Sequence, residues 1–194
     1  WPDKGGVKAF ADRWAALEVD AQLKHDLSPL ADLVETCNGP IAEIDRELER
    51  ASRSDAVIRR LMTVPGVGAV TATTWVACLD RPDRFASGDE LVAYLGLVPR
   101  EWSSSEVRFQ GRITKRGPSE LRWLLVECAW VVLTRKPAGT EHLREWALRI
   151  QHRRGKNKAA VALARRLARI LFVIWRDGTT YRPELTAGRQ AATA

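Results

Sequence analysis

The sequence lacks any hydrophobic run of about 18 residues, so it predicts no membrane-spanning helix, and we expect a cytoplasmic protein. Its three cysteines, Cys37, Cys78 and Cys128, lie far apart without metal-ligand spacing. This favours reduced thiols over a disulfide framework. The only methionine is Met62 and the first residue is Trp1, so we expect this chain to be part of a longer protein.

The motifs of several enzyme classes are also missing. There is no Walker A loop, no glycine-rich dinucleotide fingerprint and no zinc pattern. His25, His142 and His152 share no metal-ligand spacing, and the carboxylates of residues 80–90 are explained by helix capping and turns. We therefore predict no metal site in this chain.

Charge is distributed unevenly along the 194 residues. Residues 1–99 hold 11 Lys/Arg and 16 Asp/Glu, a balance of −5. Residues 100–182 hold 19 Lys/Arg and 7 Asp/Glu, a balance of +12. A basic half beside a mildly acidic one is typical of a polyanion-binding surface, although a solvated basic face is the simpler alternative.

Helical periodicity dominates, so we predict a mainly α protein. Residues 8–36 and the stretch from Ile41 to Ala51 are both amphipathic, and Asn38-Gly39-Pro40 lies between them. Residues 1–56 therefore predict a helical hairpin, either a coiled-coil arm or a pair packed on its own domain.

A compact helical domain is predicted over residues 57–182, followed by a disordered tail over 183–194. Its helices are expected at 56–63, 69–79, 87–95, 118–135, 140–154 and 157–176. The polar stretch 100–117 has no helical period and predicts a loop or a short hairpin.

The sequence Pro65-Gly66-Val67-Gly68 separates the first two helices of that domain. It is typical of a helix-hairpin-helix motif, in which Gly66 and Gly68 let the open amides of the second helix meet a phosphate. A plain turn between two helices is the alternative.

Basic residues gather in two further places. Arg100, Arg108, Arg112, Lys115 and Arg116 precede a helix N-terminus, so we predict a flexible loop that binds phosphates. The last helix carries Lys156, Lys158, Arg165, Arg166 and Arg169 opposite an apolar face, which predicts a surface that follows the nucleic-acid backbone. A solvated face is the alternative for both.

Three consecutive serines, Ser103, Ser104 and Ser105, lie within the first of these basic segments. A serine becomes a nucleophile only when a neighbouring group activates it or stabilises the charge that develops. Spacing alone therefore favours an ordinary polar loop.

Taken in order, "LMTVPGVGAVTA", "LVAYLGLVPREWSSSEVRFQGRITKRGPSELRWLLVECAW" and "NKAAVALARRLARILFVIWRDGTTY" resemble the C-terminal domain of insertion-sequence transposases of the 110/116/902 family, relatives of the Piv-type DNA invertases. The resemblance covers about residues 57–182, and residues 8–56 fit the coiled-coil segment that precedes this domain.

The resemblance implies a nucleophilic serine after "GLVP", which matches Ser104 best and Ser103 next. Ser105 stands where the family usually has glycine. It also implies a separate RNase-H-like domain that binds magnesium and is missing from this chain, a guide RNA, and dimers or tetramers. We therefore expect part of a DNA recombinase that is inactive alone, with a non-catalytic helix-hairpin-helix DNA-binding module as the alternative.

Overall fold

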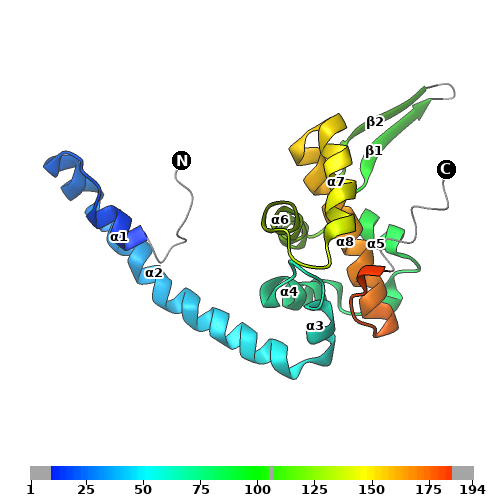
Figure 1. Ribbon diagram of the computed structural model, residues 1–194, viewed down its shortest axis with the longest axis horizontal. Helices are drawn as coiled ribbons and strands as arrows, with labels where there is room; N and C mark the ends of the chain where they lie inside the picture. The colour runs from blue at the N-terminus through cyan, green and yellow to red at the C-terminus, as the bar shows by residue number, and fades with distance from the viewer. Residues whose placement is uncertain (1–9, 105–106, 185–194) are drawn as a thin grey trace. The chain divides into compact units, whose positions relative to one another are not determined.

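The computed structural model describes residues 10–104 and 107–184 of the chain. It is mainly helical, as predicted, with one two-stranded sheet (Figure 1). The chain divides into two compact units, residues 1–51 and 52–194, which are described separately. The three cysteines are free, in line with the expectation from their spacing.

The first unit is built on two helices, α1 (Phe10–Ala15) and the long α2, which begins at Ala21 and ends at Ser54. Asp20 precedes α2 and accepts hydrogen bonds from the backbone amides of Gln22 and Leu23, at 2.9 and 3.3 Å. This is N-terminal capping by an aspartate, which satisfies two amides that have no partner inside the helix.

The predicted break at Asn38-Gly39-Pro40 is wrong, because α2 runs through it without interruption. A proline inside a helix removes one amide donor, which costs stability but need not end the helix. At Pro29 the loss is offset in place, since the Ser28 hydroxyl donates to the His25 carbonyl at 2.9 Å. That carbonyl is the one Pro29 leaves without an amide.

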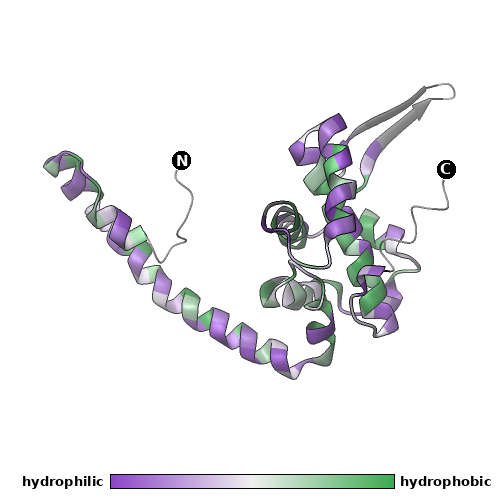
Figure 2. Ribbon diagram, in the orientation of Figure 1, coloured by the Kyte–Doolittle hydropathy of each residue, from purple (hydrophilic) through white to green (hydrophobic). Residues whose placement is uncertain are grey.

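Large apolar side chains remain exposed along α2, where hydrophilic and hydrophobic residues alternate (Figure 2). Nine residues follow one another in alternating steps of four and three, and we call them the heptad seam: Leu23, Leu27, Leu30, Val34, Cys37, Ile41, Ile44, Leu48 and Ala51. Ile41 and Ile44 are 52% and 56% exposed. This spacing is that of the contact positions of a coiled coil.

The second unit is arranged around its last helix, α8 (Lys156–Asp177), which contacts α3, η2, α5, α6 and α7. The other elements are α3 (Ala56–Leu61), α4 (Ala69–Leu79), η2 (Pro82–Arg84), α5 (Gly88–Tyr94), β1 (Pro99–Ser104), β2 (Val107–Ile113), α6 (Ser119–Arg135) and α7 (Glu141–Arg154). Ten residues of α8 are buried, among them Leu167, Phe172 and Trp175. Small and large apolar residues at helical spacing therefore let α8 pack on several sides.

The structure describes the segment after α8 as far as residue 184, and the rest of the predicted tail, 185–194, lies outside the described residues. Tyr181 anchors this segment, because its amide donates to Thr63 Oγ1 at 2.9 Å and its hydroxyl donates to the Gly139 carbonyl at 2.8 Å. Tyr181 also packs against the hydrophobic core. The end of the chain thereby ties the turn after α3 to the loop before α7.

Candidate nucleic-acid interface

The polar stretch predicted as a loop or hairpin forms an antiparallel hairpin of β1 and β2 (Figure 1). Pro99 pairs with Ile113 near its base, and Ser104 pairs with Val107 at its far end. The register shifts between Pro99 and Glu101, as in a β-bulge.

Two of the candidate serines lie in this hairpin. Ser103 pairs with Arg108, so the backbone places a candidate nucleophile opposite a predicted phosphate-binding residue. Successive strand positions alternate between two faces, so positions 103 and 104 belong to opposite faces. Ser105 lies outside the described residues. The two serines are therefore not interchangeable positions, although they are adjacent in the sequence.

The base of the hairpin is held by two glycines where backbone meets backbone. A Cβ on Gly96 would lie 2.2 Å from the Arg116 carbonyl oxygen, and one on Gly117 would lie 2.0 Å from that of Tyr94. Both glycines have positive φ, +68° and +81°. Any side chain at either position would therefore collide with backbone and also strain the chain.

Hydrogen bonds also hold the base of the hairpin. We call them, together with the close backbone contacts at Gly96 and Gly117, the clamp. The Lys115 amide donates to the Gly96 carbonyl at 3.1 Å. One guanidinium nitrogen of Arg122, Nη1, lies 3.2 Å from the carbonyl oxygens of both Leu95 and Arg116. The segment was predicted to be flexible, but these contacts hold it in place. Arg122 lies in the same basic part of the sequence, and its contacts here are structural.

Exposed cations surround the base of the hairpin. Arg112, Lys115 and Arg116 are exposed, and Arg100 is exposed with one long hydrogen bond of 3.4 Å to the Thr114 carbonyl. We call Arg100, Arg112, Lys115 and Arg116 the base cluster. The Arg108 side chain belongs to the part of the hairpin whose side chains the structure does not describe. The structure thus brings four of the predicted phosphate-binding residues together next to the serine-bearing strand β1.

The two glycines of the turn between α3 and α4 have different surroundings. Gly66 has φ of +90°, and a Cβ on it would lie 3.2 Å from the Cys128 carbonyl oxygen on α6. Gly66 therefore allows the turn to pack closely against α6. Gly68 is exposed, with nothing within 4 Å of an added Cβ.

Gly68 is the N-cap of α4, and no side chain caps the helix there. The first turn of α4 also has no acidic residue. The first amides of α4 thus keep the dipole charge of a helix N-terminus without side-chain compensation. This geometry suits an anion.

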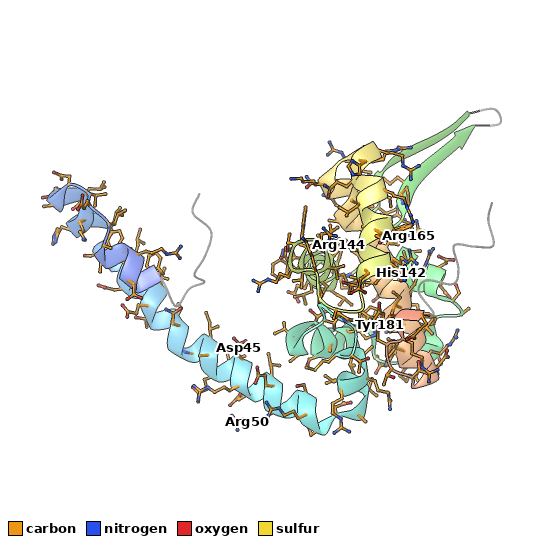
Figure 3. All side chains as sticks on the ribbon, in the orientation of Figure 1. Asp45, Arg50, His142, Arg144, Arg165 and Tyr181 are labelled. Carbon is orange, nitrogen blue, oxygen red and sulfur yellow. The ribbon has the colours of Figure 1, made fainter. Side chains whose placement is uncertain are left out.

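The arginines in the middle of α8, which were predicted to form a nucleic-acid surface, contact side chains of neighbouring helices. Asp89 on α5 forms ion pairs with Arg165 and Arg169, the first at 4.0 Å (Arg165 is labelled in Figure 3). Arg166 lies over the ring of Trp146, with its guanidinium carbon 5.0 Å from the centroid. These arginines hold α5 and α7 against α8, and Asp89 is the partner that sequence reasoning missed. The start of α8 keeps its cations exposed at Lys156 and Lys158.

The described residues offer no metal site. No group of three or more His, Cys, Asp or Glu side chains lies together in the part of the chain that the structure describes. Within the same described ranges, no helix is long and apolar enough to cross a membrane.

Comparison with known proteins gives a consistent family. Residues 58–144 match the model of the Transposase IS116/IS110/IS902 family, a stretch that runs from α3 into the start of α7 and includes the hairpin with its clamp. Over these residues the chain matches a domain of this family.

Several transposases are similar over a longer stretch. A probable family 20 transposase of Pseudomonas aeruginosa is 36% identical over 157 residues, which is 81% of this chain and 46% of that protein. The transposase for insertion sequence element IS1328 of Yersinia enterocolitica is 38% identical over 73% of this chain and 42% of its own length. The transposase for insertion sequence element IS1111A of Coxiella burnetii is 33% identical, over 73% and 39%. The chain spans less than half the length of these relatives.

Proposed function

We propose that this chain, which matches a domain of the Transposase IS116/IS110/IS902 family, is the DNA-binding and serine-bearing part of a DNA recombinase that moves an insertion sequence. The family match and the three named transposases support DNA transposition as the process. The observation that carries the proposal is the clamped hairpin. Two serines lie on a strand whose base is fixed by backbone contacts and surrounded by the base cluster.

Ser104 is the proposed nucleophile. Its hydroxyl oxygen bonds to the phosphorus of a DNA phosphodiester, and the bond from that phosphorus to one sugar oxygen breaks. The serine proton passes to water or another base, and the leaving sugar oxygen takes up a proton. Attack by a sugar hydroxyl of another strand then reverses the step, releases the serine and rejoins the DNA. Cations of the base cluster stabilise the charge on the phosphate oxygens during both steps.

Other partners belong to the same proposal. We place the magnesium ligands in a part of the protein outside this chain, so the chain alone is inactive. A guide RNA and a dimer or tetramer are proposed from the family resemblance. The exposed heptad seam supports association through α2, because paired helices would bury side chains such as Ile41 and Ile44, which are more than half exposed.

The catalytic proposal is tested with Ser104→Ala in the full-length protein. We expect recombination to be lost while DNA affinity stays unchanged, and the covalent protein–DNA product to disappear on a denaturing gel. Ser103→Ala is the matched control, since it removes the neighbouring hydroxyl of the same strand, and recombination should persist. Normal recombination by Ser104→Ala would remove Ser104 from the mechanism.

A second candidate function is a DNA-binding module without chemistry. The uncapped α4 N-terminus at Gly68, next to the turn at Gly66, favours it. In that case both serine variants would recombine normally. Gly68→Asp would place a carboxylate over the open amides of α4 and weaken DNA binding, because the carboxylate competes with phosphate for them.

Association through α2 has its own test. Replacing Ile41 and Ile44 by Asp places charges in the heptad seam and should reduce the mass of the chain in solution to that of a monomer. Glu43→Gln, outside the seam, is the control and should leave the mass unchanged. A monomeric parent chain at the same concentration would contradict the proposal.

A further inference from the structure

A second basic surface lies where α7 ends and α8 begins, around Gly155. Five exposed residues form it, and we call them the junction cluster: His152, Arg153, Arg154, Lys156 and Lys158. The sequence has no Asp or Glu between Glu145 and Asp177. The ends of both helices therefore place positive charge together without a carboxylate of their own to balance it.

The ion pairs that connect α8 to α5 lie in a different part of α8. Asp89 pairs with Arg165 and Arg169. These residues lie 7 and 11 positions beyond Lys158 in the sequence, about 10 and 16 Å along a helix that rises about 1.5 Å per residue. The middle of α8 is thus neutralised by α5, while its first turn keeps its charge.

Two arginines show that like charges also meet between the helices. The pKa of Arg166 on α8 is lowered, mainly by burial; Tyr181 acts to raise it, and repulsion from Arg149 on α7 lowers it further. Holding such charges close costs free energy, and a polyanion at the surface offsets that cost. The N-terminus of α8 adds to the attraction, because Gly155 provides no side-chain cap and the first turn has no acidic residue.

We propose that the junction cluster binds the phosphate backbone of duplex DNA without reading base sequence, at a place separate from the serine hairpin. The inference rests on the proposed function, for which it supplies an anchoring surface. Proteins that hold single strands combine cations with exposed aromatic rings on which bases stack. Here Trp146 lies under Arg166, and Phe172 and Trp175 are buried. The junction cluster itself contains no Phe, Tyr or Trp, and cations alone favour a duplex backbone.

The test is the salt dependence of DNA binding by the chain with Arg153→Gln and Arg154→Gln. Each neutralised phosphate contributes about −0.9 to the slope of log K against log salt, so we expect the slope to flatten by about two units. Affinity at about 0.1 M salt should fall by roughly tenfold to a hundredfold. An unchanged slope would overturn the proposal.

The matched control is Arg46→Gln with Arg50→Gln on α2. Arg46 and Arg50 each donate from Nε to a carbonyl four residues earlier, as Arg153 does to Arg149. Both pairs therefore lose the same charge, each pair includes an arginine with this helix contact, and only the junction pair should change DNA binding. Equal losses from both pairs would mean that net charge and not this surface attracts the DNA.

Three nucleic-acid probes of equal length complete the test: duplex DNA, single-stranded DNA and duplex RNA. We expect the junction variant to lose most affinity for duplex DNA. A larger loss with single-stranded DNA or with duplex RNA would overturn the assignment. The result is independent of the chemistry, because Ser104→Ala removes only the nucleophile and leaves this surface intact. The salt dependence of DNA binding therefore tests the junction cluster, whereas recombination by Ser104→Ala tests the catalytic proposal.

Discussion

The two long amphipathic helices, α2 and α8, each have an apolar face, but only one of these faces is buried. The apolar face of α8 is buried inside its own unit, with ten buried residues. The apolar residues of α2 remain exposed, and its large side chains such as Leu30, Ile41 and Ile44 are 52–60% accessible. A helical hydrophobic pattern thus specifies which face is to be covered, but it does not specify whether the cover comes from the same chain.

The largest expected effect comes from shortening one apolar side chain in each of the two helices. Leu167→Ala on α8 should lower the free energy of unfolding by about 2–5 kcal/mol, because it leaves a cavity at a fully buried site. Ile44→Ala on α2 removes a side chain that is 56% exposed and should lower it much less in dilute solution. Chemical denaturation followed by tryptophan fluorescence measures both. Similar losses would show that α2 is as fully packed as α8.

The next effect concerns the continuity of α2. Pro40→Ala restores an amide donor within the helix, and proline costs about 3 kcal/mol relative to alanine in a helix interior. The substitution should therefore slow hydrogen exchange of the amides around residue 40, measured by mass spectrometry on the whole chain. If residues 38–40 formed a turn between two helices, the same substitution would leave exchange there fast.

Charge offers a third contrast between the two units. Replacing Lys115 and Arg116 of the base cluster by Glu should flatten the dependence of log K for duplex DNA on log salt by about two units. The same replacement of Arg46 and Arg50 on α2 should barely change this salt dependence. The acidic residues Glu43, Asp45, Glu47 and Glu49 lie beside these arginines in the sequence, so this part of α2 does not attract DNA. A filter-binding titration between about 50 and 200 mM salt measures both slopes. Equal flattening would place the binding surface elsewhere.

The fold class could be predicted from the sequence because apolar spacing is a local property. Helices such as α4, α6 and α8 were expected within a few residues of their observed bounds. The break at residues 38–40 was predicted from Gly39 and Pro40, two residues that commonly end helices, but the apolar spacing continues from Val34 through Ile41. Regular spacing on both sides was the better indicator there.

The site could be predicted only in outline. The serines and the base cluster are visible in the sequence, since they follow one another within about 20 residues. The clamp is not, because Gly96 and Gly117 meet across 21 residues through backbone contacts that leave no residue pattern. Pairing of Asp89 with α8 was missed for the same reason: the two lie about 80 residues apart, and a carboxylate near a helix start is explained equally well by capping.

The smallest effect is expected on the polar face of α8. Asp89→Asn removes the carboxylate shared by Arg165 and Arg169, whose side chains are 35% and 42% exposed. Pairs this accessible contribute about 1 kcal/mol or less, so the free energy of unfolding should fall only slightly. The two arginines would then be available to phosphate, and the salt slope for duplex DNA should become steeper by up to about two units. A double-mutant cycle with Arg169→Gln measures the coupling, and an unchanged slope in Asp89→Asn would show that DNA does not reach the middle of α8.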